Sequence, residues 1–347
     1  MSEFRLTMLP AGDGDCLILT WGEPGLRRHA VVDGGRASTY GALRPRLETI
    51  AEGGEALELL VLTHVDADHI EGGLKYVEDA DPPVVPKRVW YNSFDSLGGF
   101  GARSVAQGDR YAAAIAKLGW RLNEAFEDGL VSVATAPSDL GVPGLRVTVL
   151  GPDGDGVEAM RGKWADWRTG HDPARFARTG RLSRSSMPPV LDVENLAAPG
   201  KTDTELPNGS SIAILAEYDG RRILLAGDAH PDTLVRSIAP LAKAEGGRLR
   251  VDVFKVSHHG SRGNVTRELV ELLDCRRFAI STDGTRHGHP DPEAIARLLA
   301  FAPPGPRELL FNYATDRTRP WADPDLARRW DYTCRYGESN GLLSIDI

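Results

Sequence analysis

The sequence contains few cysteines and no long apolar segment. Its 347 residues include three cysteines, Cys16, Cys275 and Cys334. That odd, sparse count argues against a disulfide framework and fits a reducing compartment. The sequence also lacks the run of about 18 apolar residues that a membrane-spanning helix requires. Its first residues do not combine a basic segment with an apolar one, so we expect no signal peptide, no membrane association and a cytoplasmic location.

Two common catalytic signatures are missing as well. There is no G-x-S-x-G segment and no Walker loop, which argues against a serine nucleophile on a sharp turn and against a P-loop nucleotide site. The formal net charge of −8 is not that of an obvious nucleic-acid coat protein. The apolar fraction of 41% is ordinary for a globular chain and suffices for a sizeable core.

Strand-like and helix-like segments are interleaved along the chain. Turns rich in Gly, Asp and Pro separate them, and an Asp-Gly pair at 219–220 predicts a hairpin. We predict strands at 4–10, 16–22, 29–35, 57–64, 145–152, 210–218, 221–228, 251–257, 277–284 and 341–347, and helices at 40–54, after 69, and at 110–120, 231–247 and 292–302. This order predicts an α/β sandwich with mixed sheets, formed by residues 1–347 as a single domain.

Two segments do not follow this alternation. Residues 151–206 show little apolar periodicity and are rich in Gly, Pro, Arg and Asp. We interpret them as a polar and basic insertion, or lid, within the domain, because loops of this length are usually functional or disordered. Residues 314–340 are predicted to be an elaboration before the last strand and a candidate surface for a partner.

The segment HVDADH, residues 64–69, places four metal-ligand side chains directly after an apolar strand. Imidazole nitrogen and carboxylate oxygen hold zinc and manganese in proteins. If the strand ends at Thr63, these side chains fan out at the carboxyl edge of a sheet, where α/β folds bind ligands. Positions 64 and 66 can then face one ion, and positions 68 and 69 another about 3.5–4 Å away. The alternative is a polar loop in which Asp68 caps the next helix.

Two further strands end in the same manner. The segment LLAGDA ends an apolar strand on Asp228, and VFKVSHHGS runs into His258 and His259. Three separate strands that deliver such residues at their carboxyl ends form a constellation, which favours a metal site over a capped loop.

The ordered motifs resemble the metallo-β-lactamase superfamily and, within it, the soluble domain of the bacterial competence protein ComEC. The segments that carry this resemblance span almost the whole chain: MLPAGDGDCLIL, VVDGG, THVDADHIEGG, NGSSIAIL, LLAGDA, KVSHHGS and GHPDPEAI. The resemblance implies a four-layer αββα sandwich with mixed sheets and a metal site at the sheet edges. It also implies two divalent metal ions, zinc or manganese, with magnesium as an alternative.

The resemblance assigns a role to each ligand-type residue. The implied ligands are His64 and Asp66 for one ion, Asp68, His69 and His258 for the other, and Asp228 as a bridge between them. Asp66 stands where histidine is commoner, and this carboxylate favours manganese over zinc. His258 lies nearer the strand end than His259, so we predict that His258 binds metal, with His259 as the alternative. If His258 is the ligand, His259 contacts substrate or caps the following turn.

Other residues are candidates for supporting roles. Asp33 is predicted to accept a hydrogen bond from a ligating histidine, and Asp15 to lie at the edge of the site. Lys255 either pairs with a carboxylate there or merely ends its strand. Asn208 stands where the superfamily often has a further histidine. It is a weak ligand or a substrate contact in one interpretation, and a turn residue in the other.

Catalytic roles beyond metal binding are assigned to Asp68, His259 and His289. In this fold His289 can lie opposite the metals, where it binds a phosphate oxygen or protonates a leaving group. His287 competes with it for this role. The alternative is an ordinary loop histidine before a helix that begins with proline.

The implied reaction is metal-dependent hydrolysis of a phosphodiester by a metal-bridging hydroxide, as in a nuclease. One alternative is a phosphoesterase or other ester hydrolase that acts on a small substrate. Another is a catalytically silent partner-binding module on the same fold. β-Lactam hydrolysis is disfavoured by Asp66 and by the missing histidine.

The insertion suggests a substrate. Between residues 161 and 184, seven basic side chains are interleaved with Trp164, Trp167 and Phe176, against two acidic ones. Basic groups with aromatic platforms suit single-stranded nucleic acid. The alternative is a solvated lid whose charge balances an acidic body.

Overall fold

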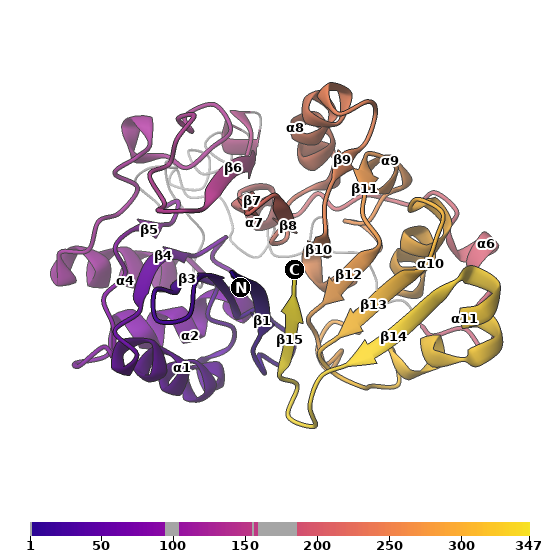
Figure 1. Cartoon of the computed structure of the whole chain (residues 1–347), viewed down its shortest axis with the longest axis horizontal. Coiled ribbons are helices and arrows are strands. Elements are labelled where there is room, and N and C mark those ends of the chain that lie inside the picture. Colours follow the sequence, from indigo (N-terminus) through magenta and orange to yellow (C-terminus); the bar gives the residue numbers. More distant parts are fainter. Residues whose placement is uncertain (1, 94–103, 155, 159–185) are drawn as a thin grey trace, which may run out of the picture.

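The computed structural model describes residues 2–93, 104–154, 156–158 and 186–347 (Figure 1). The basic and aromatic segment 161–184 lies outside the described residues, so its predicted role is not addressed by the fold. None of the described helices is long and apolar enough to cross a membrane.

The first part of the chain builds most of a six-stranded sheet with the order β15-β1-β2-β3-β4-β5. Its strands are β1 Glu3–Met8, β2 Leu17–Gly22, β3 Arg28–Val32, β4 Ala56–Val61, β5 Val89–Trp90 and β15 Leu343–Asp346. Two antiparallel hairpins join β1, β2 and β3, and β3, β4 and β5 run parallel. The last strand of the chain pairs antiparallel with the first, with Leu6 opposite Ile345.

The second sheet has seven strands in the order β14-β13-β12-β10-β8-β7-β6. They are β6 Arg146–Gly151, β7 Ala213–Tyr218, β8 Arg221–Leu225, β10 Val253–Lys255, β12 Arg277–Ile280, β13 Arg307–Phe311 and β14 Tyr332–Tyr336. From β8 to β14 neighbouring strands run parallel, whereas β6, β7 and β8 are antiparallel, so the sheet is mixed as predicted. Strand β14 lies in the predicted elaboration 314–340, which therefore extends the sheet.

Three apolar cores define four layers. Residues such as Leu19 and Trp21 from the first sheet pack against Ile223 and Leu310 from the second, which forms the core between the sheets. The outer face of the first sheet packs under α1 Tyr40–Glu52, α2 Ala67–Val77 and α4 Ser104–Leu118. The outer face of the second packs under α6 Val193–Leu196, α8 Pro231–Ala244, α9 Arg267–Glu271, α10 Pro292–Phe301 and α11 Pro324–Trp330. The predicted αββα sandwich is confirmed, and Figure 1 shows the helices on the two outer sides.

Short elements complete the described part of the chain. They are the two-stranded sheet of β9 Leu249–Arg250 and β11 Leu273–Asp274, the helix α7 Leu206–Gly209, and the single turns η1 Ala37–Thr39, η2 Glu127–Gly129, η4 Ser257–Gly260 and η5 Arg319–Ala322. Helix α6 lies in the predicted insertion 151–206 and packs on α10, and helix α7 begins at the last residue of that insertion. The described ends of that insertion therefore belong to the sandwich.

Strand β4 ends earlier than predicted. It stops at Val61, because the backbone N–H of Thr63 donates to the carboxylate of Asp33 at 2.8 Å and leaves the sheet ladder. Helix α2 begins at Ala67, so Asp66 rather than Asp68 occupies its N-cap position. Among the described residues the Asp66 carboxylate caps no helix N–H. The capping interpretation of this segment is therefore wrong for both aspartates.

The two Gly-Gly pairs of the motifs pack against each other. The N–H of Gly34 donates to the His69 carbonyl at 2.8 Å, and the N–H of Gly72 donates to the Gly35 carbonyl at 2.9 Å. A Cβ on Gly72 would lie 2.0 Å from the Gly34 oxygen, so no side chain fits there. Helix α2 thus docks backbone to backbone on the turn after β3, which places His69 beside Asp33.

Gly72→Ala is expected to lower the free energy of unfolding by about 1–3 kcal/mol or more, because overpacking forces the helix away from the turn. Urea unfolding would measure the loss. Gly41→Ala is the matched control, since Gly41 lies in helix α1 and has no described atom within 4 Å of an added Cβ. That change should be neutral or stabilising by about 0.5–1 kcal/mol. Equal behaviour of the two variants would contradict the docking argument.

Candidate metal centre

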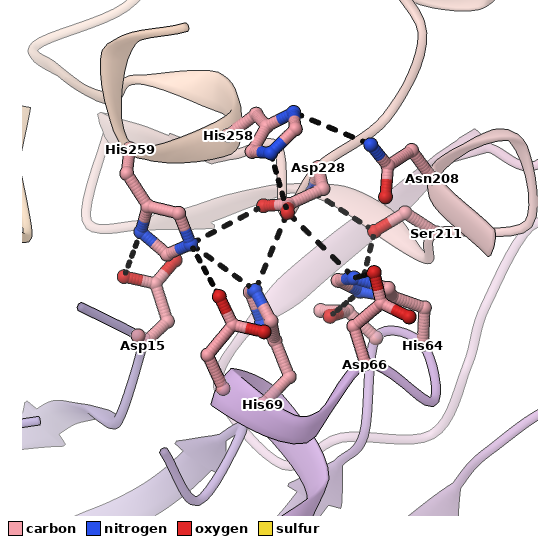
Figure 2. Close-up of polar contacts among 12 residues, drawn as sticks. Asp15, His64, Asp66, His69, Asn208, Ser211, Asp228, His258 and His259 are labelled. Carbon is pink, nitrogen blue, oxygen red and sulfur yellow. Dashed lines mark hydrogen bonds and ion pairs between the residues drawn. The ribbon is translucent and has the colours of Figure 1, made fainter. Parts of the chain in front are cut away.

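The predicted ligands meet where the carboxyl ends of strands from both sheets face each other. His64 follows β4, Asp68 and His69 lie in the first turn of α2, and Asp228 follows β8. His258 and His259 lie in the turn after β10, and Asp15 comes from the loop between β1 and β2. Figure 2 shows the side chains of Asp15, His64, His69, Asp228, His258 and His259 pointing toward one another from the two halves of the chain. The fold therefore brings together the three strand ends that the sequence singled out.

Four imidazoles converge on the carboxylate of Asp228, which is 2% exposed. Its oxygens lie 3.6 Å from His64 Nε2, 3.4 Å from His69 Nε2, 3.7 Å from His258 Nε2 and 3.9 Å from His259 Nε2. Burial alone would raise the pKa of this carboxyl, but the surrounding histidines hold it well below its usual range. The centre is thus an ionised carboxylate enclosed by imidazole nitrogens.

Each of these histidines is oriented through its other ring nitrogen. The Nδ1 atoms lie on oxygen acceptors: Thr63 Oγ1 at 3.0 Å for His64, Asp33 Oδ2 at 2.8 Å for His69, Asn264 Oδ1 at 3.0 Å for His258, and the Ser281 carbonyl at 2.8 Å for His259. An Nδ1–H that donates in this way leaves the Nε2 lone pair directed at the centre. Metal-ligating histidines are held in this manner in proteins.

The donor set fits a divalent metal ion. Within the described part of the chain, His64 Nε2 and Asp228 Oδ1 are buried without a hydrogen-bond partner. Buried polar atoms without partners are rare and costly. The ligand atoms of His64, His69 and Asp228 lie within 4.8 Å of one another, and so do those of Asp68, His69 and His259. Mixed imidazole and carboxylate donors suit zinc and manganese.

Asp66 lies at the open side of the centre. Its Oδ2 atom is 3.8 Å from His64 Nε2. Burial and the neighbouring Asp68 carboxylate raise the pKa of Asp66 to about 7. A bound cation would offset both effects, since it favours the charged form of the carboxyl.

Of the two adjacent histidines, the geometry favours His259 as the metal ligand, whereas the prediction was His258. His259 is 1% exposed, and its Nε2 atom lies 3.2 Å from His69 Nε2 and 3.8 Å from Asp68 Oδ2. His258 is in none of the compact ligand groups that the described residues form. Both residues adopt left-handed backbone conformations, with φ of 48° and 55°. Two such residues in succession turn both side chains into the site, which distance from the strand end did not reveal.

A buried ion pair, formed by Lys255 and Asp15, lies beside the centre. Lys255 Nζ lies 2.7 Å from Asp15 Oδ2, and both side chains are 1% exposed. The pair joins β10 of the second sheet to the β1–β2 loop of the first. Asp15 Oδ1 also lies 3.6 Å from His259 Nδ1. Of the two interpretations of Lys255, the structure shows the one in which it pairs with a carboxylate.

Asp33 holds His69 and Thr63 in place through hydrogen bonds. It accepts hydrogen bonds from His69 Nδ1 and from the backbone and hydroxyl of Thr63.

Asp33→Asn is expected to weaken metal binding by about 10–100-fold, as removal of such an anchor typically does. Metal titration of the chelator-treated protein would measure this. Asp219→Asn is the control, because Asp219 is also left-handed, with φ 52°, but lies in the exposed β7–β8 turn. Unchanged affinity in Asp33→Asn would contradict the anchoring role.

The remaining predicted residues border the centre. Asn208 is 1% exposed on helix α7, and its Nδ2 atom lies 3.3 Å from His258 Nδ1. The His289 ring lies 5.3 Å from the His258 ring, and the His287 ring stacks 6.1 Å beyond it. The structure thus brings both loop histidines to the mouth of the site.

Sequence reasoning did not single out several residues that hold the ligands in place. They are Thr63, Asp203, Ser211, Asn264 and Ser281. Thr63 and Ser211 lie inside the motifs THVDADHIEGG and NGSSIAIL. Asp203 lies within the segment interpreted as an insertion, and Asn264 follows a motif, so neither carried a pattern of its own.

The family to which this chain is similar in sequence agrees with this architecture. The Metallo-beta-lactamase superfamily profile matches residues 12–284. ComE operon protein 3 of Bacillus subtilis (strain 168) is 28% identical over 116 residues, which cover 32% of this chain and only 14% of that protein. Zn(2+)-bound PqqB from Methylobacterium extorquens aligns with 15% identity and a TM-score of 0.39 over 96% of this chain and 88% of PqqB. YhfI from Bacillus subtilis, a metallo-beta-lactamase fold protein, aligns with 11% identity and a TM-score of 0.36 over 99% of this chain and 100% of YhfI. With its four-layer fold and the profile match across most of its length, the chain belongs to the metallo-β-lactamase superfamily.

Proposed function

We propose that this protein is a metal-dependent phosphodiesterase, with nuclease activity as the first candidate. The convergence of four imidazoles on the buried carboxylate of Asp228 carries this proposal. Divalent ions held there would polarise a phosphoryl oxygen and lower the pKa of an attacking water. No protein nucleophile is then required.

The ligands divide between two sides of Asp228. His64 and Asp66 would hold one ion, and Asp68, His69 and His259 the other, with Asp228 shared between them. The compact grouping of Asp68, His69 and His259 supports the second set. The 3.8 Å approach of Asp66 to His64 supports the first. This mixed set of imidazole and carboxylate donors suits zinc or manganese.

Cationic and hydrogen-bonding groups at the mouth favour an anionic substrate. Arg36 pairs with Asp13 at 2.6 Å, and Arg286 and His287 each lie 3.8 Å from the same carboxylate. Asp13, Asp68 and His287 form one cluster, so this rim adjoins the centre. Guanidinium and imidazole groups bind phosphate oxygens well. A phosphodiester carries the charge that this rim would recognise, whereas a neutral ester or lactam does not.

The proposed polymer substrate is single-stranded nucleic acid. The seven basic and three aromatic residues between 161 and 184 support it. A bound strand would be held by phosphate contacts and base stacking. Binding should then weaken steeply as salt concentration rises.

Metal content measured together with activity tests the proposed function. We expect protein purified without chelator to bind zinc or manganese and to cleave bis-p-nitrophenyl phosphate and single-stranded DNA. An Asp68→Ala/His69→Ala variant should lose both metal and cleavage. Cleavage of the small diester but not of DNA would establish the alternative of a small-substrate phosphoesterase. Bound metal without cleavage of any phosphodiester would overturn the proposal and favour the silent binding module.

A further inference from the structure

Four side chains at the mouth of the site form a surface that we call the Asp13 rim: Asp13, Arg36, Arg286 and His287. Asp68 connects this rim to the metal centre. An Asp68 oxygen lies 3.8 Å from His259 Nε2, and the ligand atoms of Asp13, Asp68 and His287 lie within 4.8 Å of one another. Phosphates of a stacked nucleic-acid strand follow each other on a similar scale, with about 3.4 Å of helix axis per nucleotide. A strand whose phosphate lies at the centre would therefore bring a neighbouring phosphate to the rim.

Backbone contacts on two sides hold Asp13 in place. The N–H of Asp283, which follows β12 of the second sheet, donates to the Gly12 carbonyl at 2.8 Å. On the other side, a Cβ on Gly14 would lie 1.9 Å from the Asp68 carbonyl oxygen, so the β1–β2 loop touches the backbone of α2. The Asp13 residue itself is 5% exposed. The rim is thus formed before a ligand arrives, which lowers the cost of ordering it on binding.

The ion pair between Arg36 and Asp13 fixes the plane of the guanidinium group. Nε donates to Asp13 Oδ1 at 3.1 Å and Nη2 donates to Asp13 Oδ2 at 2.6 Å. A pair of this kind occupies one edge of the planar group. Among the described residues, no side chain or backbone carbonyl accepts a hydrogen bond from the Nη1 atom at the other edge. Because the Arg36 side chain is 17% exposed, the Nη1 donors remain for an anionic ligand.

The Asp13 rim favours an anion over a further metal ion. By distance alone, Asp13, Asp68 and His287 could hold a cation. However, Arg36 already neutralises Asp13, and Arg286 Nε lies 3.8 Å from the same carboxylate. Guanidinium groups remain protonated in proteins, so both would repel a cation at this position. The Arg286 side chain is 64% exposed, which allows it to turn toward a bound anion.

We infer that the Asp13 rim binds a second phosphate group of the substrate, next to the phosphodiester that is cleaved. Arg36 and Arg286 would then determine specificity for oligonucleotides over simple diesters. This inference rests on the proposed phosphodiesterase function. The second phosphate is either the next diester of a strand or a terminal phosphomonoester, because both present the anionic oxygens that guanidinium groups recognise.

Cleavage of substrates with one and with two phosphates tests this inference. The full-length protein would be assayed with manganese on the thymidine dinucleotide, on the same dinucleotide phosphorylated at its 5′ or its 3′ end, and on the thymidine trinucleotide. We expect the second phosphate to raise kcat/KM per cleavable linkage by about tenfold or more, the effect of one hydrogen bond to a charged group. A gain in a phosphorylated dinucleotide identifies a terminal phosphate as the ligand, and a gain in the trinucleotide identifies the next diester.

Two rim variants test whether these arginines supply the gain. Asp13→Asn/Arg36→Gln removes both members of the ion pair, so that no buried carboxylate is left without its partner. It should reduce the gain by about tenfold, and Arg286→Gln should reduce it in part. Arg328→Gln is the control, because this arginine of α11 is 76% exposed and should leave the gain intact. Metal content per chain would distinguish a loss of specificity from damage to the centre.

The possible failures of the two proposals differ. Equal kcat/KM of the unaltered protein on substrates with one and with two phosphates would overturn this inference and leave the proposed function standing. A gain that persisted in full in both rim variants would also overturn it. Absence of cleavage of every phosphodiester would overturn the proposed function and this inference together. Far-ultraviolet circular dichroism would verify that each variant is folded.

Discussion

Asp228→Asn is expected to lower metal-dependent phosphodiesterase kcat/KM by about a thousandfold or more, the largest effect of any single substitution proposed. Asparagine keeps the shape of the side chain and removes its charge. The four Nε2 atoms now 3.4–3.9 Å from this carboxylate would then face a neutral amide. Because about 1.36 kcal/mol corresponds to a tenfold change in rate, the loss is about 4 kcal/mol of transition-state stabilisation. That magnitude is reasonable for the loss of a group that holds metal and charge at the reacting centre.

The measurement is kcat/KM for bis-p-nitrophenyl phosphate at saturating manganese, with metal content determined in parallel. Asp219→Asn is again the control, because it makes the same chemical change in an exposed turn. It should leave both quantities unchanged. If Asp228→Asn retained activity within tenfold of the unaltered protein, Asp228 would not be the shared ligand, and the proposed centre would need a different organisation.

Much of the fold could be predicted because local patterns and tertiary structure agree. The Asp-Gly pair at 219–220 joins β7 to β8, and the apolar run before His64 is the buried strand β4. The ends of parallel strands lie at one edge of a sheet, so the residues after them were expected to meet. Asp228 and His259 do meet there, although they come from different strands.

What could not be predicted depends on contacts between distant segments. Asp203 lies in a polar segment without periodicity, and its partner His258 is 55 residues away. The order of the paired histidines depends on two left-handed residues, which the sequence HHGS does not specify. The end of β4 depends on Asp33, which accepts the N–H of Thr63 from 30 residues away. In each case the deciding interaction is a hydrogen bond or a backbone conformation, to which apolar periodicity is insensitive.

The second large effect is expected from Lys255→Met, which should lower the free energy of unfolding by about 3–5 kcal/mol. Lys255 and Asp15 form an ion pair of 2.7 Å, and each is 1% exposed. Removing one member of a buried pair leaves the other charge without compensation, and this costs more than the intact pair contributes. Urea unfolding of the chelator-treated protein would measure the loss without a contribution from bound metal. Lys243→Met, an exposed position on α8, should change stability by no more than about 0.5 kcal/mol.

The pH dependence and the double variant distinguish an unpaired charge from lost packing. In the unaltered protein burial would raise the pKa of Asp15, but Lys255 and then His259 lower it well below its usual range. Its stabilising contribution is therefore present above the usual carboxyl pKa and lost only in strong acid. Without the lysine, the attraction that lowers the pKa of Asp15 is reduced, so burial should raise this pKa. As the pH falls, protonation of Asp15 should then remove the cost of its buried, uncompensated charge. The deficit of Lys255→Met should accordingly be larger at pH 7.5 than at pH 5. Asp15→Asn/Lys255→Met should recover part of the stability, since it leaves no buried charge. A deficit that is independent of pH and not reduced in the double variant would assign the loss to packing of the lysine stem instead.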